Sequence, residues 1–180
     1  RRNVENASTR LVAHPLHALR RSGVGLYRGG VAVMSGFACV SLFNPKTAEN
    51  VGAVMRAAHC YRVAQVNISG ARGKALRHCT NTPMAHRHTP VFLVEDVLEY
   101  LPYDTQVVAV DLVPGAVSLP EFKHPRRAVY LFGPEDGTLG KRHLDRAQHV
   151  VYVPTRNCMN LAACVNVVLY DRMAKGPSHD

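Results

Sequence analysis

The stretch Leu131-Phe132-Gly133-Pro134-Glu135-Asp136-Gly137 decides the fold class of this chain. An apolar run of β-branched and aromatic residues at 128–132 stops abruptly at Gly133 and Pro134, which indicates a buried strand followed by a loop. A second run, at 149–153, stops in the same way at Pro154. Because open α/β sheets bind ligands where their strands end, these two loops predict a pocket made mostly of backbone.

Strand and helix patterns alternate through the rest of the chain. Strands are expected at 37–42, 64–68, near Val91, and at 106–111, 128–132 and 149–153. Helices are expected at 48–60, near Lys74, and at 95–101, 140–147 and 160–173. That order predicts an α/β fold with a mainly parallel sheet flanked by helices.

The composition indicates one basic domain. The 180 residues are 47% hydrophobic, enough for a sizeable core, and 22 Lys and Arg against 13 Asp and Glu give a net charge of +9. Such a charge favours a polyanionic partner such as nucleic acid, although a basic protein without that role remains the alternative. The five cysteines are scattered without a C-x-x-C pair, which indicates neither a disulfide framework nor a zinc cluster and fits a cytoplasmic protein. No membrane span or signal peptide is expected.

The first 36 residues differ from the remainder. They hold six arginines against one acid, Glu5, a net of +5. We interpret 1–36 as a weakly ordered basic arm that could contact phosphate, with a passive solvated tail as the alternative. Residues 37–180 then form the folded domain.

The helix expected at 48–60 carries the best candidate catalytic side chain, Arg56. Its apolar residues recur at helical spacing and predict a buried stripe: Val51, Val54, Met55 and Ala58. Gly52 and Arg56, four residues apart, lie together on another face. The loop at 44–47 and Asn50 place polar groups at the helix entrance, where free N–H groups favour an anion such as phosphate. The alternative role for Arg56 is a surface salt bridge.

Three separated segments resemble one family, in the correct order. They are Asn50-x-Gly52-x-x-x-Arg56, then Phe132-Gly133-x-Glu135-x-Gly137, and Pro154 followed by Cys158-Met159-Asn160-Leu161-Ala162. These resemble the motifs of the SPOUT-class RNA ribose methyltransferases of the TrmH branch, and the third is similar to the compact TrmL type. Cys158 and Ala162 stand where that type has serine, which puts a hydroxyl role there in doubt.

The resemblance implies a C-terminal deep trefoil knot, an exception to the rule that chains are unknotted. It also implies a homodimer and S-adenosylmethionine bound in the knot. The cofactor-binding residues it implies are Val110, Asp111, Leu112, Leu131, Phe132, Gly133, Gly137, Val153, Pro154, Cys158, Asn160, Leu161 and Ala162.

The resemblance further implies catalytic roles for Arg56, Glu135 and Asn160. Arg56 would activate or position a ribose 2′-hydroxyl together with an RNA phosphate, because guanidinium is too basic to accept a proton unaided. Glu135 would hold the dimer loop or RNA, and the alternative is a loop carboxylate that accepts backbone N–H groups. Asn160 is both an expected N-cap and an active-site polar group. The residues expected to bind RNA are Lys46, Asn50, Arg56 and Arg156.

Cysteine and histidine suggest other chemistry. Cys158 could be a nucleophile, but no positioned histidine can be named, so packing or lining of the donor pocket is favoured. The spacing of His78, His86 and His88 matches no zinc motif, and we expect no metal.

The sequence therefore favours an RNA 2′-O-methyltransferase acting on the wobble nucleotide of a tRNA anticodon loop. The small domain favours an accessible loop over a folded ribosomal site, so ribosomal RNA is the second choice. A catalytically silent RNA-binding or assembly factor is the alternative from another class, and a base methyltransferase fits the motifs less well.

Overall fold

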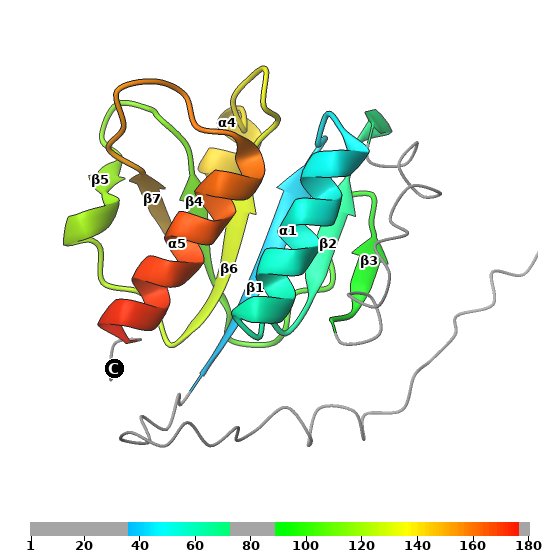
Figure 1. Ribbon diagram of the computed structural model, residues 1–180, viewed down its shortest axis with the longest axis horizontal. Coiled ribbons are helices and arrows are strands. Elements are labelled where there is room, and N and C mark those ends of the chain that lie inside the picture. The colour runs from blue at the N-terminus through cyan, green and yellow to red at the C-terminus, as the bar shows by residue number, and fades with distance from the viewer. Residues whose placement is uncertain (1–35, 73–88, 177–180) are drawn as a thin grey trace, which may run out of the picture. The chain divides into compact units, whose positions relative to one another are not determined.

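The computed structural model of the chain describes residues 36–72 and 89–176 (Figure 1). The expected arm at 1–36, apart from Gly36, and the expected helix near Lys74 lie outside the described residues. No helix within the described ranges is long and apolar enough to cross a lipid bilayer.

A parallel sheet of seven strands forms the centre of the described domain. In spatial order the strands are β3 (Val91–Leu93), β2 (Val66–Ser69), β1 (Phe37–Phe43), β6 (Arg127–Phe132), β4 (Gln106–Val110), β7 (His149–Tyr152) and β5 (Val117–Ser118). Every pairing between neighbours in this order is parallel. The α/β class and the mainly parallel sheet are thus confirmed, and all carboxyl ends of the strands lie along one edge.

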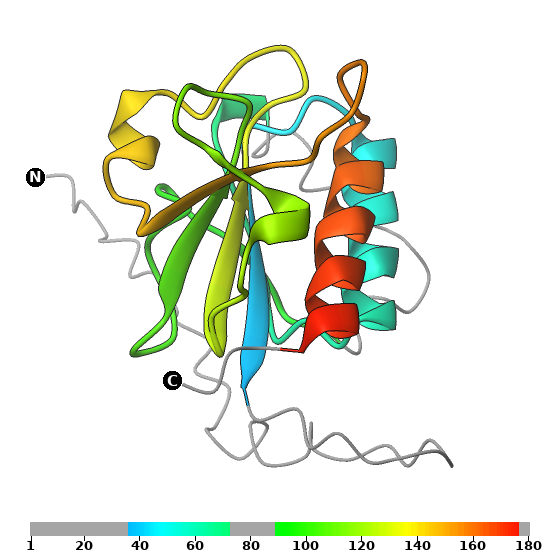
Figure 2. The ribbon, with the colours of Figure 1, turned by 90° about the vertical axis from the view of Figure 1, so that its left-hand side faces the viewer.

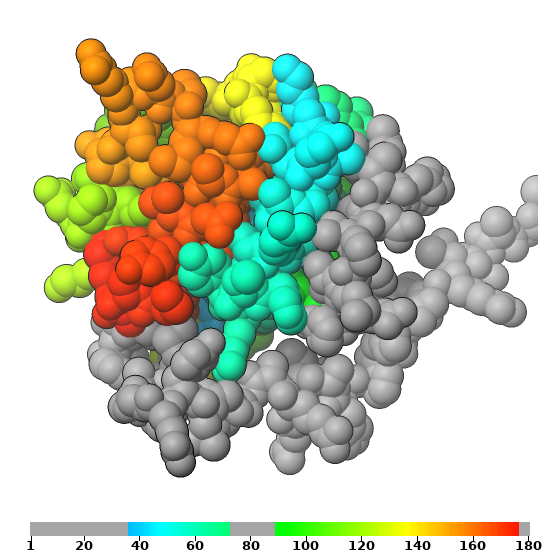
Figure 3. Space-filling view, in the orientation of Figure 1, coloured from blue at the N-terminus to red at the C-terminus, as the bar shows by residue number. Residues whose placement is uncertain are grey.

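Helices cover both faces of the sheet. The helices α1 (Ala48–Cys60) and α5 (Leu161–Lys175) pack side by side on one face, and α4 (Lys141–Leu144) lies over the other (Figures 1 and 2). Figure 3 shows the outer surface of α1 and α5 at the centre of the view. A sheet covered on both faces explains why its strands read as continuous apolar runs rather than as alternating ones.

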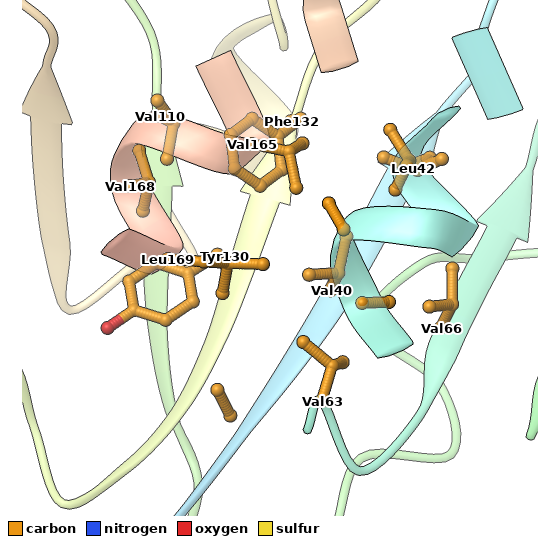
Figure 4. Close-up of a cluster of buried hydrophobic side chains, with 14 of the residues drawn as sticks. Val40, Leu42, Val63, Val66, Val110, Tyr130, Phe132, Val165, Val168 and Leu169 are labelled. Carbon is orange, nitrogen blue, oxygen red and sulfur yellow. The ribbon is translucent and has the colours of Figure 1, made fainter. Parts of the chain in front are cut away.

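Two apolar clusters hold the layers together, one on each side of the sheet. Alternate residues of a strand point to opposite faces, so Val40 of β1 belongs to the cluster under α1 and α5, whereas Cys39 belongs to the other. Figure 4 shows the first cluster, in which strand and α5 side chains meet. Its labelled members are Val40, Leu42, Val63, Val66, Val110, Tyr130, Phe132, Val165, Val168 and Leu169.

Capping residues set the ends of the two long helices. The side chain of Thr47 accepts a hydrogen bond from Asn50 N at the start of α1, and Asn160 accepts from the N–H groups of Ala162 and Ala163 at the start of α5. The predicted N-cap role of Asn160 is confirmed, and so are the predicted bounds of α1 and its buried stripe.

The predicted helix at 95–101 is wrong. Asp96 ends it, because its Oδ1 accepts a hydrogen bond from Leu98 N and its carbonyl accepts from Glu99 N, which closes a turn. Tyr100 then adopts a left-handed φ of 56°, and Pro102 follows, so the chain cannot continue as a helix.

The predicted helix at 140–147 is shorter in the structure, where α4 spans only Lys141–Leu144. Gln148 already pairs with Val107 at the start of β4 through both its backbone N–H and its side-chain oxygen, so the chain has to leave the helix before β7. The sequence reading also missed β5 and the short 3-10 helix η3 (Leu119–Glu121) that follows it.

A buried polar cluster joins the C-terminal half of α5 to the sheet. Arg172 donates to the hydroxyl of Tyr130 at 3.2 Å, and that hydroxyl lies 2.6 Å from Nδ1 of His124. Nε2 of His124 lies 2.8 Å from Oδ2 of Asp171, which also pairs with Lys175 at 2.7 Å. A neutral ring with its proton on Nε2 satisfies every one of these groups, with each donor facing an acceptor.

This cluster predicts a pH dependence of stability. Burial lowers the pKa of His124 below its usual 6.5, and Asp171 only partly offsets that effect, while Arg172 and Lys175 lower the pKa further. The unfolded chain therefore binds the proton more readily, so the contribution of His124 is complete above about pH 6.5 and is lost as the pH falls through the folded pKa. We expect a smaller free energy of unfolding in urea at about pH 5.5 than at about pH 7.5.

The variant His124→Gln isolates this contribution from those of the other histidines. We expect the difference between the two pH values to be smaller in His124→Gln than in the wild type. An identical difference in both proteins would show that His124 is not the titrating group.

Candidate functional site

Three loops meet at the carboxyl edge of the sheet. They follow β1 (residues 44–47), β6 (133–140) and β7 (153–160), and α1 and α5 begin from the first and the last of them. In Figure 3 the cyan start of α1, the yellow loop after β6 and the orange loop after β7 lie along the upper edge of the molecule. The prediction that the loops at Gly133 and Pro154 leave a buried sheet is confirmed.

A chain of side-chain hydrogen bonds connects the three loops. Asn160 donates from Nδ2 to Oδ1 of Asn50 at 2.9 Å, and Asn50 donates from Nδ2 to Oε1 of Glu135 at 2.5 Å. The other carboxylate oxygen of Glu135 accepts the backbone N–H of Lys46 at 2.8 Å. Residues that are 85 and 110 positions apart in the sequence are thereby held in one polar constellation.

Both oxygens of Glu135 are thus occupied within its own chain. This matches the second of the two roles expected for it, a loop carboxylate that accepts N–H groups, and it orients the amide of Asn50. Asn160 also has two tasks at once, since Oδ1 caps α5 while Nδ2 reaches Asn50.

Arg56 lies six residues, about 1.7 helical turns, further along α1 than Asn50. Its side chain is exposed, on the side of the helix away from the buried stripe, and Gly52 one turn earlier is only half-buried. Within residues 36–72 and 89–176, no hydrogen bond or ion pair engages its guanidinium group. The salt-bridge alternative therefore finds no support among the described residues, and the five donors of Arg56 face solvent.

The residues expected to line a cofactor fall into two groups. Five have side chains packed in the apolar core and could meet a ligand only through their backbone: Val110, Leu131, Phe132, Leu161 and Ala162. The others lie in the loops after β4, β6 and β7, at the edge of the sheet: Asp111, Leu112, Gly133, Gly137, Val153, Pro154, Cys158 and Asn160. Because β6, β4 and β7 are neighbours in the sheet, the loops that follow these three strands lie next to one another.

Asp111 ties two of the loops to each other. Its Oδ1 accepts from Leu112 N at 2.8 Å, and its Oδ2 accepts from Leu139 N at 2.9 Å across the sheet edge. Gly133 lies directly under the same segment, because a Cβ at this position would come within 3.2 Å of Leu139 N. The backbone of Gly133 is thus approached closely by the protein's own loop, and its close approach to a ligand stays a prediction.

Exposed cations border the site. The side chains of Lys46 and Arg156, both expected to bind RNA, are exposed in the loops after β1 and β7. Cys158 is exposed in the same loop as Arg156. Within the described ranges, no group of three or more His, Cys, Asp or Glu side chains is arranged to hold a metal ion.

The sequence analysis missed two residues beside the site, Arg72 and Asp136. They form an ion pair in which Nη1 and Nη2 of Arg72 reach the two carboxylate oxygens of Asp136 at 2.8 and 3.0 Å. Proximity to Glu135 was the one signal that could have pointed to Asp136, whereas Arg72 follows the end of β2 in no recognised motif.

Comparison with known proteins identifies a matching family. Residues 38–170 match the sequence model of the SpoU rRNA Methylase family, and that range includes the loops after β1, β4, β6 and β7. No curated protein matches the chain.

Solved structures share the fold at low sequence identity. The SpoU methyltransferase AviRb from Streptomyces viridochromogenes, in complex with the cofactor AdoMet, aligns with a TM-score of 0.65 and 18% identity over 80% of this chain. The TrmH/SpoU tRNA modifying enzyme of A. aeolicus aligns with a TM-score of 0.67 and 19% identity, covering 79% of this chain and 78% of its own. The chain spans only 60% of the length of AviRb.

A third similar structure was described for the 2-OH methylation of C/U34 on tRNA. It aligns with a TM-score of 0.63 and 24% identity, covering 78% of this chain and 97% of its own. At these identities the three likenesses establish the fold alone.

Proposed function

Since this chain belongs to the SpoU rRNA methylase family, we propose that it transfers a methyl group from S-adenosylmethionine to a ribose 2′-hydroxyl of RNA. The observation that carries the proposal is the hydrogen-bonded chain Asn160–Asn50–Glu135, which joins the loops after β1, β6 and β7. Six residues further along α1 stands Arg56, whose guanidinium group has no ion-pair partner among the described residues. Such a constellation can hold a ribose and its phosphate in one orientation next to a donor site.

The loops after β4, β6 and β7 fit the methyl donor. A nucleoside with an amino-acid tail needs N–H and C=O groups at a sheet edge more than charged side chains, and the absence of a side chain at Gly133 lets the loop at Leu139 pack closely over the end of β6. We propose that the backbone at 110–112, 131–133, 153–154 and 158–162 holds it. The donor supplies an electrophilic sulfonium methyl group.

Arg56 has the task of positioning the ribose hydroxyl. Its planar group can hold a phosphate oxygen and a ribose oxygen together, and its positive charge stabilises the negative charge that develops on the 2′-oxygen as the hydroxyl proton passes to solvent water and the methyl group is taken up. Lys46 and Arg156 would hold further phosphates. Glu135 acts by orienting Asn50, and Asn160 presents its amide to the same place.

We propose a cytoplasmic tRNA as the substrate, methylated at the wobble nucleotide. The described domain has no large RNA-binding extension. The alignment with the structure described for C/U34 methylation covers 97% of that protein, so nearly all of it has a counterpart in this chain. The family description favours the second candidate, ribosomal RNA.

We further propose a homodimer and a knotted C-terminus. The outward side of α5 carries apolar side chains that a partner subunit would cover: Val167, Tyr170 and Met173 are 36%, 58% and 50% exposed. In support of the knot, α5 returns from β7, at the far side of β4, to pack against α1.

Two measurements test the proposed function. The first is calorimetry with S-adenosylmethionine, which measures donor binding. In the second, tRNA and rRNA transcripts are incubated with the protein and the donor and are then cleaved in alkali. A 2′-O-methylated nucleotide resists this cleavage, because the 2′-oxygen can no longer attack the phosphate. Resistance at the wobble position supports the proposal, resistance in rRNA favours the second candidate, and the absence of donor binding favours a catalytically silent RNA-binding protein.

The contact between Gly133 and Leu139 allows a prediction about donor binding. In Gly133→Val the new side chain would press on the backbone of Leu139 and displace the loop after β6, so we expect donor affinity to fall at least about tenfold, which is about 1.4 kcal/mol. Calorimetry measures this.

The matched control is Ala174→Val, which adds side-chain volume at an exposed position near the end of α5, away from the loops of the site. We expect its donor affinity to stay close to that of the wild type. Equal losses in both variants would exclude the Gly133–Leu139 contact as the cause.

A further inference from the structure

Arg72 connects two loops of the site from outside it. Besides its ion pair with Asp136, it donates from Nη2 to the carbonyl oxygen of Asn44 at 2.9 Å. Asn44 is the first residue after β1, and Asp136 stands in the loop after β6. One guanidinium group thus binds the backbone that leads into α1 and the loop that contains Glu135.

Hydrogen bonds and a close backbone contact fix the position of the main chain around Arg72. The N–H of Arg72 donates to Oδ1 of Asn44 at 3.0 Å, and Asn44 N donates to Ser69 O at 2.8 Å. Gly70 has a φ of +91°, and a Cβ there would lie 2.7 Å from the Cβ of Asn44. Only glycine allows the end of β2 to approach Asn44 this closely, so Arg72 projects from a fixed point.

The ion pair anchors the loop immediately next to the functional carboxylate, which is that of Glu135. Asp136 follows Glu135, whose oxygens hold Asn50 and the N–H of Lys46. Arg72 lowers the pKa of Asp136, chiefly by hydrogen bonding, so both partners are charged at neutral pH. Two parallel N–H···O bonds define the direction as well as the distance between Arg72 and Asp136.

We propose that Arg72 is a positioning residue for methyl transfer. By holding Asp136 and Asn44 together, it keeps Glu135 in register with α1, so that Glu135 orients the amide of Asn50. Arg72 has no contact with the reacting groups and acts only through this chain of contacts. The inference rests on the proposed function for its kinetic part, whereas the orientation of Asn50 can be measured without any substrate.

A structural role alone would give a different pattern of effects. The side chains of Arg72 and Asp136 are 33% and 47% exposed, and ion pairs with such exposure contribute little to global stability. We therefore expect Arg72→Ala to unfold at nearly the wild-type urea concentration, while the turnover rate falls.

The experiment compares Arg72→Ala, Arg72→Lys and Asp136→Ala with Arg127→Ala. Arg127 is a matched control, because it forms an ion pair of the same length, 2.8 Å to Asp104, at the opposite end of β6. The first readout is the ¹⁵N NMR signal of the Asn50 side-chain amide, assigned by its disappearance in Asn50→Asp. The second readout is kcat and KM, measured separately.

In Arg72→Ala and Asp136→Ala we expect the Asn50 amide signal to shift and to exchange faster with water. We expect kcat to fall about tenfold with the donor Kd unchanged, because a displacement of even about 1 Å can cost a hundredfold in rate. Lysine at position 72 should restore little, since it cannot form the two parallel bonds. Arg127→Ala should match the wild type in both readouts.

An unchanged Asn50 signal in Arg72→Ala would overturn the inference, and so would an unchanged kcat in an active enzyme. If the wild type methylates no RNA, the proposed function fails instead, and the Asn50 signal still decides whether Arg72 positions the site.

Discussion

Replacing Arg56 with alanine is expected to lower the rate of methyl transfer at least about a hundredfold, the low end for a group that assists proton transfer. The side chain is exposed and forms no hydrogen bond or ion pair with another described residue, so its removal should leave folding and donor binding nearly intact. The loss should therefore be seen in single-turnover assays with saturating donor and RNA, where binding no longer limits the rate.

Arg56→Lys separates charge from geometry. Lysine keeps the positive charge but loses the planar group that can hold a phosphate and a ribose oxygen together, so we expect it to rescue poorly. Arg62→Asn is the matched control, because Arg62 is an exposed arginine just beyond the other end of α1, with a left-handed φ of 55° that asparagine tolerates. A wild-type rate in Arg56→Ala would refute the proposed role of Arg56, and the family membership of the chain would still stand.

The largest effect on stability is expected for Arg172→Ala. Arg172 is only 4% exposed and donates four hydrogen bonds, to Pro125 O, Tyr130 Oη, Phe37 O and Arg126 O. Its removal would take this donor away from the carbonyl oxygens of Pro125 and Phe37 and from the hydroxyl of Tyr130, whereas the carbonyl oxygen of Arg126 would keep the N–H of Phe37. We expect a loss of about 3–5 kcal/mol in the free energy of unfolding, the range for breaking a buried charged network.

Urea unfolding followed by circular dichroism measures this loss. The control is Arg127→Ala at the start of β6, because the Arg127 side chain is 43% exposed and its loss should cost within about 0.5 kcal/mol. A loss below about 1 kcal/mol in Arg172→Ala would mean that water replaces the guanidinium group at no great cost.

Much of the fold follows from local patterns in the sequence. The apolar stripe of α1 and its polar entrance predicted the bounds Ala48–Cys60, and the breaks at Gly133 and Pro154 predicted where β6 and β7 end. The same local rules failed at 95–101, where a side-chain hydrogen bond from Leu98 N to Asp96 replaced the helical one. They also failed for α4, where pairing of Gln148 with β4 ended the helix early.

For the site, motif spacing predicted which loops matter but not how they touch. The cap formed by Asn160 depends on residues two and three positions away and was predictable. Its contact with Asn50, and that of Asn50 with Glu135, join residues far apart in the sequence, and no periodicity encodes such pairs. Arg72 escaped notice because its partners come from two other strand ends.

The amino-acid sequence by itself determined the α/β class, the ends of the main strands and the buried face of α1. These features depend on hydrophobic periodicity and turn chemistry, which act over a few residues. Only the tertiary structure decided the strand order, which sets the loops after β1 and β6 side by side, and thereby the hydrogen bonds of Glu135 and Arg72. Those bonds exist because the parallel strands end at one edge of the sheet, where polar groups from distant segments find one another as partners.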